Sequence, residues 1–277
     1  MRNSINCRGK LLDLSEPKVM GILNLTPDSF YDGGQNTELK QIQKKVSQML
    51  ADGMDILDVG AVSSKPGAEH VSLEEETQRL IPVVQHLHRN FPDLILSIDT
   101  FRAKIAEKAI ASGASMINDI SAGNLDDEMI DCVTQLQVPY IAMHMQGTPQ
   151  SMQDNPNYEN LIIELIKYFS ELQNRCYKKG LNDLIIDPGF GFGKTLNHNY
   201  ELLKNLNLFH SLELPMLVGI SRKSMLYKPL NTSAEQALNA TSVAHTLALA
   251  NGANILRVHD VKQAKETIEI YSLYEKA

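Results

Sequence analysis

The chain has 277 residues, of which 43% are hydrophobic and 21% are charged, and its net charge at pH 7 is -7. This length and composition fit one domain over residues 1–277 and exclude extended disorder, while the acidic balance argues against a nucleic-acid binder, whose surface would be basic. The scattered Cys7, Cys132 and Cys176, with no leader peptide and no apolar run of membrane-spanning length, predict a reduced, cytoplasmic protein without a membrane partner.

Short apolar runs alternate with segments of helical periodicity along the whole chain. The expected strands cover residues 18–23, 55–59, 94–98, 115–117, 139–143, 184–186, 216–219 and 255–258. The expected helices cover residues 37–51, 73–89, 103–112, 126–136, 158–179, 198–212, 234–251 and 261–274. Because parallel strands need crossover connections, eight strand–helix pairs predict an α/β fold, a (β/α)8 TIM barrel. The alternative is a doubly wound open sheet, but no strand is followed by a G-x-G-x-x-G turn.

The first of these strands runs into a polar loop over residues 24–34. Asn24 stands at the carboxyl end of the strand, and Pro27, Gly33 and Gly34 prevent the loop from continuing it. Aspartates and aromatic residues are interleaved there, among them Phe30 and Asp32, a composition typical of a closing lid. The alternative interpretation is a solvated turn that only precedes the next helix.

Polar residues stand at the carboxyl end of every expected strand, which is where barrel enzymes carry their chemistry. Asp99, Asn118 and Asp187 suit a flat heterocycle with donors and acceptors in one plane, whose carbonyl edge Lys223 could bind. The last strand and the first are neighbours in a closed barrel, so Arg257, His259 and Asn24 would form a phosphate or pyrophosphate site. Asn24 could also ligate Mg²⁺ as a hard oxygen donor. The alternatives are that Asp99 caps the next helix and that His259 is a satisfied histidine at a strand end.

A glycine-rich segment over residues 187–194 follows the sixth strand. It is not a Walker phosphate loop, because the pattern that ends at Lys194 would need glycine at position 188, which is Pro188. The glycines would instead let the backbone approach a ligand, with Phe190 or Phe192 as an aromatic wall. His144 has no second metal ligand spaced near it and is interpreted as a lining or core residue.

Four motifs together resemble the dihydropteroate synthase family along nearly the whole chain. They are residues 20–34, 187–194, Ser221 to Met225, and the terminal Arg-Val-His-Asp of residues 257–260. The resemblance implies a barrel that joins a pterin-CH₂-diphosphate to para-aminobenzoate and releases pyrophosphate. It also implies Mg²⁺ as cofactor and a homodimer built from outer helices.

The same resemblance assigns roles to individual residues. It implies that the pterin is held by Asp99, Asn118, Asp187 and Lys223, and the diphosphate with Mg²⁺ by Asn24, Arg257 and His259. Ser64, Pro66, Phe192 and Ser224 would contact aminobenzoate, and Phe30 and Asp32 would close over the site. Lys65 of the second loop is also an expected substrate-binding residue. Asp32, Asp99, Lys223 and Arg257 are the expected catalytic residues. No covalent enzyme nucleophile is required.

The second loop departs from the family pattern. The family usually reads Gly-Glu-Ser-Thr-Arg-Pro-Gly where this chain has Ala-Val-Ser-Ser-Lys-Pro-Gly over residues 61–67. Ser64 keeps a hydroxyl, Lys65 keeps a charge but loses the planar fork of arginine, and Val62 lacks a carboxylate. Two other functions stay open: a pterin-binding methyltransferase that serves a corrinoid protein, and a non-catalytic pterin-binding module.

Overall fold

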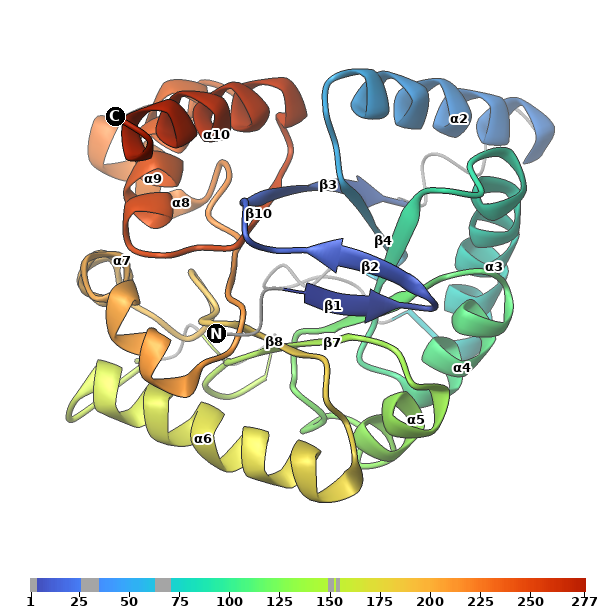
Figure 1. The fold of residues 1–277 in the computed structure, drawn as a ribbon, viewed down its shortest axis with the longest axis horizontal. Helices are drawn as coiled ribbons and strands as arrows, with labels where there is room; N and C mark the ends of the chain where they lie inside the picture. Colours follow the sequence, from blue (N-terminus) through green and yellow to red (C-terminus); the bar gives the residue numbers. More distant parts are fainter. Residues whose placement is uncertain (1–3, 26–34, 63–70, 149–151, 153–154) are drawn as a thin grey trace.

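The computed structural model describes residues 4–25, 35–62, 71–148, 152 and 155–277. A β-hairpin, strands β1 (Ser4–Cys7) and β2 (Lys10–Asp13), precedes a repeated strand–helix pattern (Figure 1). The strands of the repeat are β3 (Lys18–Asn24), β4 (Ile56–Gly60), β5 (Ile95–Asp99), β6 (Met116–Asp119), β7 (Tyr140–Met143), β8 (Leu184–Asp187), β9 (Leu217–Val218) and β10 (Ile255–Val258). The helices are α2 (Gln35–Ala51), α3 (Leu73–Asn90), α4 (Ala103–Ala111), α5 (Met129–Leu136), α6 (Leu161–Lys179), α7 (Leu196–Lys204), α8 (Ser224–Tyr227), α9 (Leu238–Ala250) and α10 (Val261–Glu275).

The strands β3 to β10 form one parallel sheet in the order β8-β7-β6-β5-β4-β3-β10-β9. A parallel bridge between Ile186 and Met216 joins the two outer strands, and the Ile186 amide donates to the Pro215 carbonyl at 3.0 Å. The sheet therefore closes on itself, with the helices around it (Figure 1). The predicted (β/α)8 barrel is confirmed, and the open sheet is wrong.

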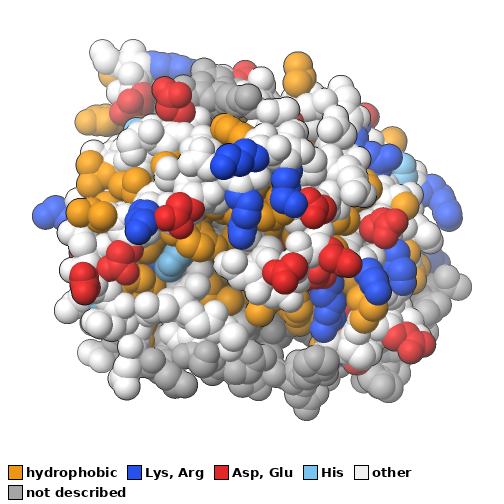
Figure 2. Space-filling model, turned by 90° about the horizontal axis from the view of Figure 1, so that it is seen from below, with side chains coloured by type: hydrophobic (Ala, Val, Ile, Leu, Met, Phe, Trp, Pro, Cys, Tyr) orange, Lys and Arg blue, Asp and Glu red, His pale blue; other side chains and the backbone are white. Residues whose placement is uncertain are grey.

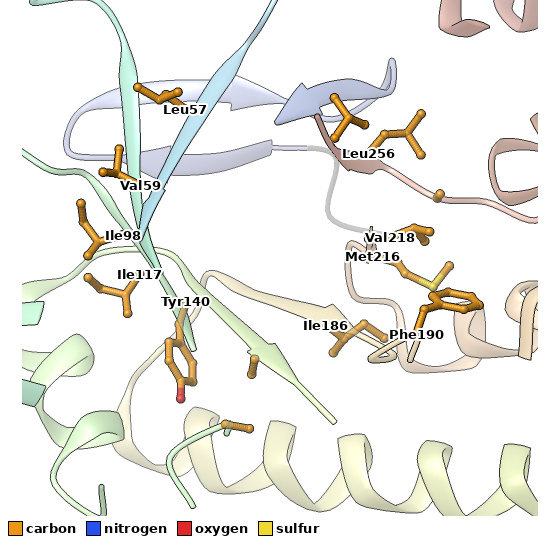
Figure 3. Packing of buried hydrophobic residues seen from close by; sticks show 14 of the residues in the cluster. Leu57, Val59, Ile98, Ile117, Tyr140, Ile186, Phe190, Met216, Val218 and Leu256 are labelled. Atoms are coloured by element: carbon orange, nitrogen blue, oxygen red, sulfur yellow. The ribbon is translucent and has the colours of Figure 1, made fainter. Parts of the chain in front are cut away.

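Alternate residues of each strand point outward and pack beneath the helices, because side chains in a strand alternate between its two faces. Leu57, Val59, Ile98, Ile117 and Leu256 are fully buried in this layer (Figure 3). The helices complete it with apolar stripes, such as Leu80, Val83, Val84 and Leu87 on α3. Apolar residues on both faces explain why the strands read as continuous hydrophobic runs.

The hairpin β1–β2 lies across one end of the barrel (Figure 1). Its buried residues pack on the first inward-facing residue of the strands, in a cluster of Ile5, Cys7, Leu12, Leu14, Met20, Ile56, Met116, Ile141, Ile185, Leu217 and Ile255. Arg8 fixes the hairpin by donating from Nη1 to the carbonyl oxygens of Ile110 and Ala114, at 2.9 and 3.1 Å. The amino-terminal end of the barrel is thus covered by an apolar floor that the sequence did not predict.

Several element bounds differ from the expected ones. The expected helix 198–212 divides at Asn205 into α7 and a 3-10 helix, η1 (Leu206–Leu212). The helix α6 begins only at Leu161, where Asn160 accepts a hydrogen bond from the Ile163 amide and caps it. A short helix α8 and a 3-10 helix η2 (Lys228–Leu230) follow β9, and α9 begins at Leu238 rather than residue 234.

Figure 2 shows one face of the molecule, on which acidic and basic side chains are interspersed among apolar ones. Elsewhere among the helices, an ion pair joins Lys179 of α6 to Asp131 of α5. Of the helices in the described part of the chain, none has the length and apolar character needed to cross a bilayer.

Candidate active site

Most inward-facing positions become polar one step above the apolar floor. Two residues beyond each floor residue, the side chain again points into the barrel. The residues at this second level are Ile22, Asp58, Ser97, Asn118, Met143, Asp187, Gly219 and Arg257. A polar layer therefore lies on an apolar base, near the carboxyl ends of the strands.

Asp58 is the centre of this layer and is fully buried. Its Oδ1 accepts a hydrogen bond from Ser97 Oγ at 2.6 Å, and its Oδ2 accepts from Asn118 Nδ2 at 3.0 Å and from Arg257 Nε at 2.7 Å. Arg257 also donates from Nη2 to Asp99 Oδ2 at 2.8 Å. The sequence showed Asp58 at a strand end but gave it no role. Asp58 occupies an inward-facing position of its strand, as Asp99 and Asn118 do in theirs. This position could have identified Asp58 as a site residue.

Burial and the surrounding charges shift the pKa values of the two groups at the top of this network. Removal from water raises the pKa of Asp99 to about 7, although the Arg257 charge acts in the opposite direction. Burial also acts to lower the pKa of Arg257, but Asp58 and Asp99 outweigh it and hold that pKa above its usual value. Asp99 thus titrates close to neutrality beside a permanent cation.

Asp187 and Lys223 form a second group across the barrel. Asp187 Oδ1 accepts the Gly189 amide at 2.8 Å. Lys223 Nζ donates to the Phe190 carbonyl and lies 4.7 Å from the centroid of the Phe192 ring. Burial lowers the pKa of Lys223 to about 8, with Asp187 opposing the shift, and raises the pKa of Asp187, with Lys223 opposing.

Lys194 is only 3% exposed, and its side chain binds the glycine-rich segment to which it belongs. Its Nζ lies 3.1 Å from His144 Nδ1 and donates to the carbonyls of Gly189 and Phe192 at 3.0 and 3.1 Å. A lysine whose amine binds its own loop does not serve as a phosphate-loop lysine, in agreement with the sequence interpretation. His144 is buried, as predicted for a lining or core residue.

At the rim of the barrel, His259 is bonded to Ser221. His259 Nδ1 lies 3.1 Å from Ser221 Oγ, and the His259 amide donates to the same oxygen at 3.2 Å. Burial and the nearby Arg257 charge lower the pKa of His259. Asn24 and Ser224 are exposed at the same end of the barrel.

The alternative that Asp99 caps a helix is wrong. The residue before α4 is Arg102, whose side chain makes no capping bond, and the Ala103 amide is bound by Asp126 Oδ2 at 2.8 Å. The structure brings Asp99, Asn118 and Arg257 together through Asp58, and Asp187, Phe192 and Lys223 through the loop after β8. The predicted site residues Phe30, Asp32, Ser64, Lys65 and Pro66 lie outside the described residues.

Comparison with known proteins agrees with this arrangement. Residues 20–259 match the family described as pterin binding enzymes. The chain is 43% identical to the dihydropteroate synthase of Escherichia coli K12, over 95% of this chain and 93% of that protein. It is 40% identical to the dihydropteroate synthase of Haemophilus influenzae, over 95% of each.

Solved structures give the same result. A Yersinia pestis dihydropteroate synthase with a sulfonamide drug complex superposes with a TM-score of 0.92 at 42% identity, over 99% of this chain and all of that one. The Xanthomonas albilineans dihydropteroate synthase with 4-aminobenzoic acid has a TM-score of 0.91 at 36% identity, over the whole of both chains.

The fold and the polar layer define a barrel enzyme of the pterin-binding class. Within that class, the chain belongs to the dihydropteroate synthase family, the transferases of folate synthesis.

Proposed function

We propose that this chain condenses 6-hydroxymethyl-7,8-dihydropterin diphosphate with para-aminobenzoate to give 7,8-dihydropteroate and pyrophosphate. The observation that carries the proposal is the polar layer above the apolar floor. Buried carboxylates and an amide face inward there, with Lys223 at their edge. A pterin presents ring N–H and amino donors beside ring nitrogen and carbonyl acceptors, which is the complement of such a set.

The pterin would lie between the two groups of the layer. Asp187 uses Oδ1 for the Gly189 amide and offers its other oxygen to pterin N–H groups, while the Lys223 ammonium donates to the carbonyl edge. Asn118 and Asp99 would bind the opposite side of the ring. Asp58 orients both of them, because it accepts from Asn118 directly and holds the arginine that binds Asp99.

The diphosphate would extend toward Arg257, His259 and Asn24 at the rim. Among the described residues there is no cluster of three or more His, Cys, Asp or Glu side chains able to hold a metal by themselves. The Asn24 amide oxygen at the rim fits Mg²⁺ brought in with the diphosphate, since this ion is often held by one or two protein oxygens plus substrate phosphates. Asn24 would supply its amide oxygen, and the ion would neutralise charge on the leaving pyrophosphate.

Aminobenzoate would occupy the outer part of the mouth, beside Phe192, Ser224 and the predicted Ser64, Lys65 and Pro66. The C–O bond between the pterin methylene and the diphosphate breaks, and its electron pair leaves on the pyrophosphate oxygen. The aminobenzoate nitrogen forms the new C–N bond and loses a proton. Arg257 favours this path by stabilising negative charge on the leaving group, and the pterin ring delocalises the positive charge left on the methylene.

Pyrophosphate release tests the proposal. The purified chain should release pyrophosphate from the pterin diphosphate with Mg²⁺ only when aminobenzoate is present. Lys223→Met should abolish release, while Lys204→Met, an exposed lysine on α7, should not change it. A pterin-binding methyltransferase and a non-catalytic module would both release none, and that result would refute the proposal.

We also infer that the protein acts in the cytoplasm as a homodimer. The helices α7, α8 and α9 contact one another and present exposed apolar side chains that water would otherwise cover. These side chains are Leu196 and Tyr200 on α7, Val243 and Leu247 on α9, and Leu230 on η2, which follows α8. Light scattering should give twice the chain mass, and Val243→Glu with Leu247→Glu should give the monomer. A wild-type monomer at micromolar concentration would refute the homodimer.

A further inference from the structure

Lys194 is a buried cation for which the family resemblance gave no role. All three of its hydrogen-bond partners are neutral, namely the His144 ring and the carbonyls of Gly189 and Phe192. Burying a charge without a bonded carboxylate is costly, so such an arrangement is expected only where the charge has a specific use. Burial accordingly lowers the pKa of Lys194 to about 7, although the nearby charge of Asp187 acts in the opposite direction.

The two carbonyls bound by Lys194 are the ends of one tight turn. The Phe192 amide donates to the Gly189 carbonyl at 3.1 Å and closes this turn. Gly189, Gly191 and Gly193 all adopt positive φ, at 74°, 79° and 60°, so the segment contains residues with unusually wide conformational freedom. Lys194 therefore fixes a segment whose own backbone is permissive.

That turn carries the two groups that hold Lys223. The Phe190 carbonyl accepts a hydrogen bond from Lys223 Nζ, and the Phe192 ring lies beneath the same ammonium. Lys194 binds the carbonyls of Gly189 and Phe192. Phe190 lies between these two residues in the chain, and Phe192 is itself one of them. A change in Lys194 is thus transmitted to Lys223 through at most a few covalent bonds.

Other side chains bind the loop at Gly191 and Gly193, but among the contacts described only Lys194 binds the carbonyls at both ends of the turn. Asn199 Oδ1 accepts the Gly191 amide at 2.7 Å, and Tyr158 Oη donates to the Gly193 carbonyl at 2.7 Å. Neither of these contacts reaches the carbonyls of Gly189 or Phe192. His144 completes the arrangement, since burial and the Lys194 charge lower its pKa to about 3 and keep Nδ1 available as an acceptor.

We propose that Lys194 is a positioning residue for the transfer reaction, which holds the turn from Gly189 to Phe192 so that Lys223 is aimed at the pterin. The inference rests on the proposed function for the identity of the ligand. Lys194 does not touch the substrates. It acts through Lys223, and its loss is expressed as weaker pterin binding.

A double-mutant cycle separates positioning from a purely structural role. Lys194→Met, Lys223→Met, the double variant and the surface control Lys204→Met are titrated with a fluorescent pterin analogue. Lys194→Met should weaken binding about tenfold or more, and the double variant should bind no more weakly than Lys223→Met alone. If Lys194→Met is folded by circular dichroism and binds like wild type, or if the two losses multiply, the proposal is overturned.

A second variant covers the case in which Lys194→Met does not fold. His144→Leu removes one acceptor of Lys194 and keeps the lysine. It should weaken pterin binding by about threefold in the wild-type protein, but should cause no further loss of binding in the Lys223→Met variant. An unchanged dissociation constant would overturn the proposal. Failure of the proposed function is recognised separately, because wild type would then release no pyrophosphate, whereas failure of the positioning role leaves wild type active and the variants equal to it.

Discussion

Arg257 Nη2 donates to Asp99 Oδ2 at 2.8 Å, joining strands that are separated by two others in the sheet. The same guanidinium binds Asp58, so one arginine spans two carboxylates at the mouth of the barrel. These two carboxylates balance its charge. A diphosphate that approaches Arg257 must therefore compete with Asp99, whose pKa of about 7 lets it take up a proton when the arginine is drawn away.

Replacing Arg257 should affect both stability and substrate use. Arg257→Ala leaves the fully buried Asp58 without its cation, which should lower the free energy of unfolding by about 3 kcal/mol. It should also raise the KM for the pterin diphosphate sharply, because a phosphate contact is lost. Denaturant unfolding and steady-state kinetics measure the two effects. An unchanged KM would remove Arg257 from the substrate site.

Asp58 should affect pterin affinity although it lies below the rim of the barrel. Asp58→Asn keeps the shape but removes the charge that orients Arg257 and Asn118, so pterin affinity should fall by about tenfold or more. Titration with a pterin analogue measures this. Asp93→Asn, whose side chain is fully exposed at the opposite end of the barrel, is the matched control. Equal affinity in both variants would mean that Asp58 only supports the fold.

The pKa of Lys223 predicts a basic limb in the activity profile. Because burial lowers this pKa to about 8, the ammonium that we propose to bind the pterin carbonyl is lost as the pH rises through that value. The kcat/KM for the pterin diphosphate should fall about tenfold per pH unit above it. Lys223→Arg does not titrate in this range, so its weaker activity should lack the limb. A limb that persists in Lys223→Arg would assign it to another group.

Lys194 should make stability depend on pH. Its pKa is about 7 in the folded chain, against an ordinary value of 10.5, so between these values the unfolded chain binds more protons than the folded one. The free energy of unfolding should therefore rise with pH in this window, by up to about 1.4 kcal/mol per unit. Lys194→Met should lack this rise in urea unfolding measured from pH 7 to 10. Parallel curves for the two proteins would contradict the shift.

The second loop should alter inhibition by sulfonamides, which mimic aminobenzoate. Restoring the family residues with Val62→Glu, Ser64→Thr and Lys65→Arg returns a carboxylate, a methyl group and a planar guanidinium to the loop. Inhibition constants and the KM for aminobenzoate should both change, while the KM for the pterin diphosphate should not. Indistinguishable inhibition constants would show that the departure from the family has no effect on this pocket.

The barrel could be predicted because the patterns that indicate its strands and helices are local in the sequence. Each strand is a short apolar run, each helix has its own period, and eight repeats leave little choice of architecture. The sequence also predicted Asp99, Asn118, Asp187, Lys223 and Arg257 as mouth residues from their positions at strand ends. The hairpin was missed because each of its strands has only four residues, and only the first of them alternates between exposed and buried positions.

The pairing of side chains was not predictable in the same way. Arg257 was expected among phosphate ligands, and nothing in the spacing showed that Asp58, 199 residues away, would bind its Nε. Lys194 was considered only as part of a phosphate-loop pattern. Its contact with His144 spans 50 residues and depends on how two neighbouring strands end. Such contacts follow from the closed sheet, which no local pattern contains.

The hairpin across the amino-terminal end of the barrel has a kinetic consequence. Since the apolar floor covers that end, we expect substrates and displaced water to enter and leave through the opposite mouth of the barrel. The deeper layer formed by Asp58, Asn118 and Asp187 must then be filled before the outer part of the mouth is occupied. The two substrates should bind in a compulsory order, pterin diphosphate before aminobenzoate, and an aminobenzoate analogue bound alone should slow the entry of the pterin.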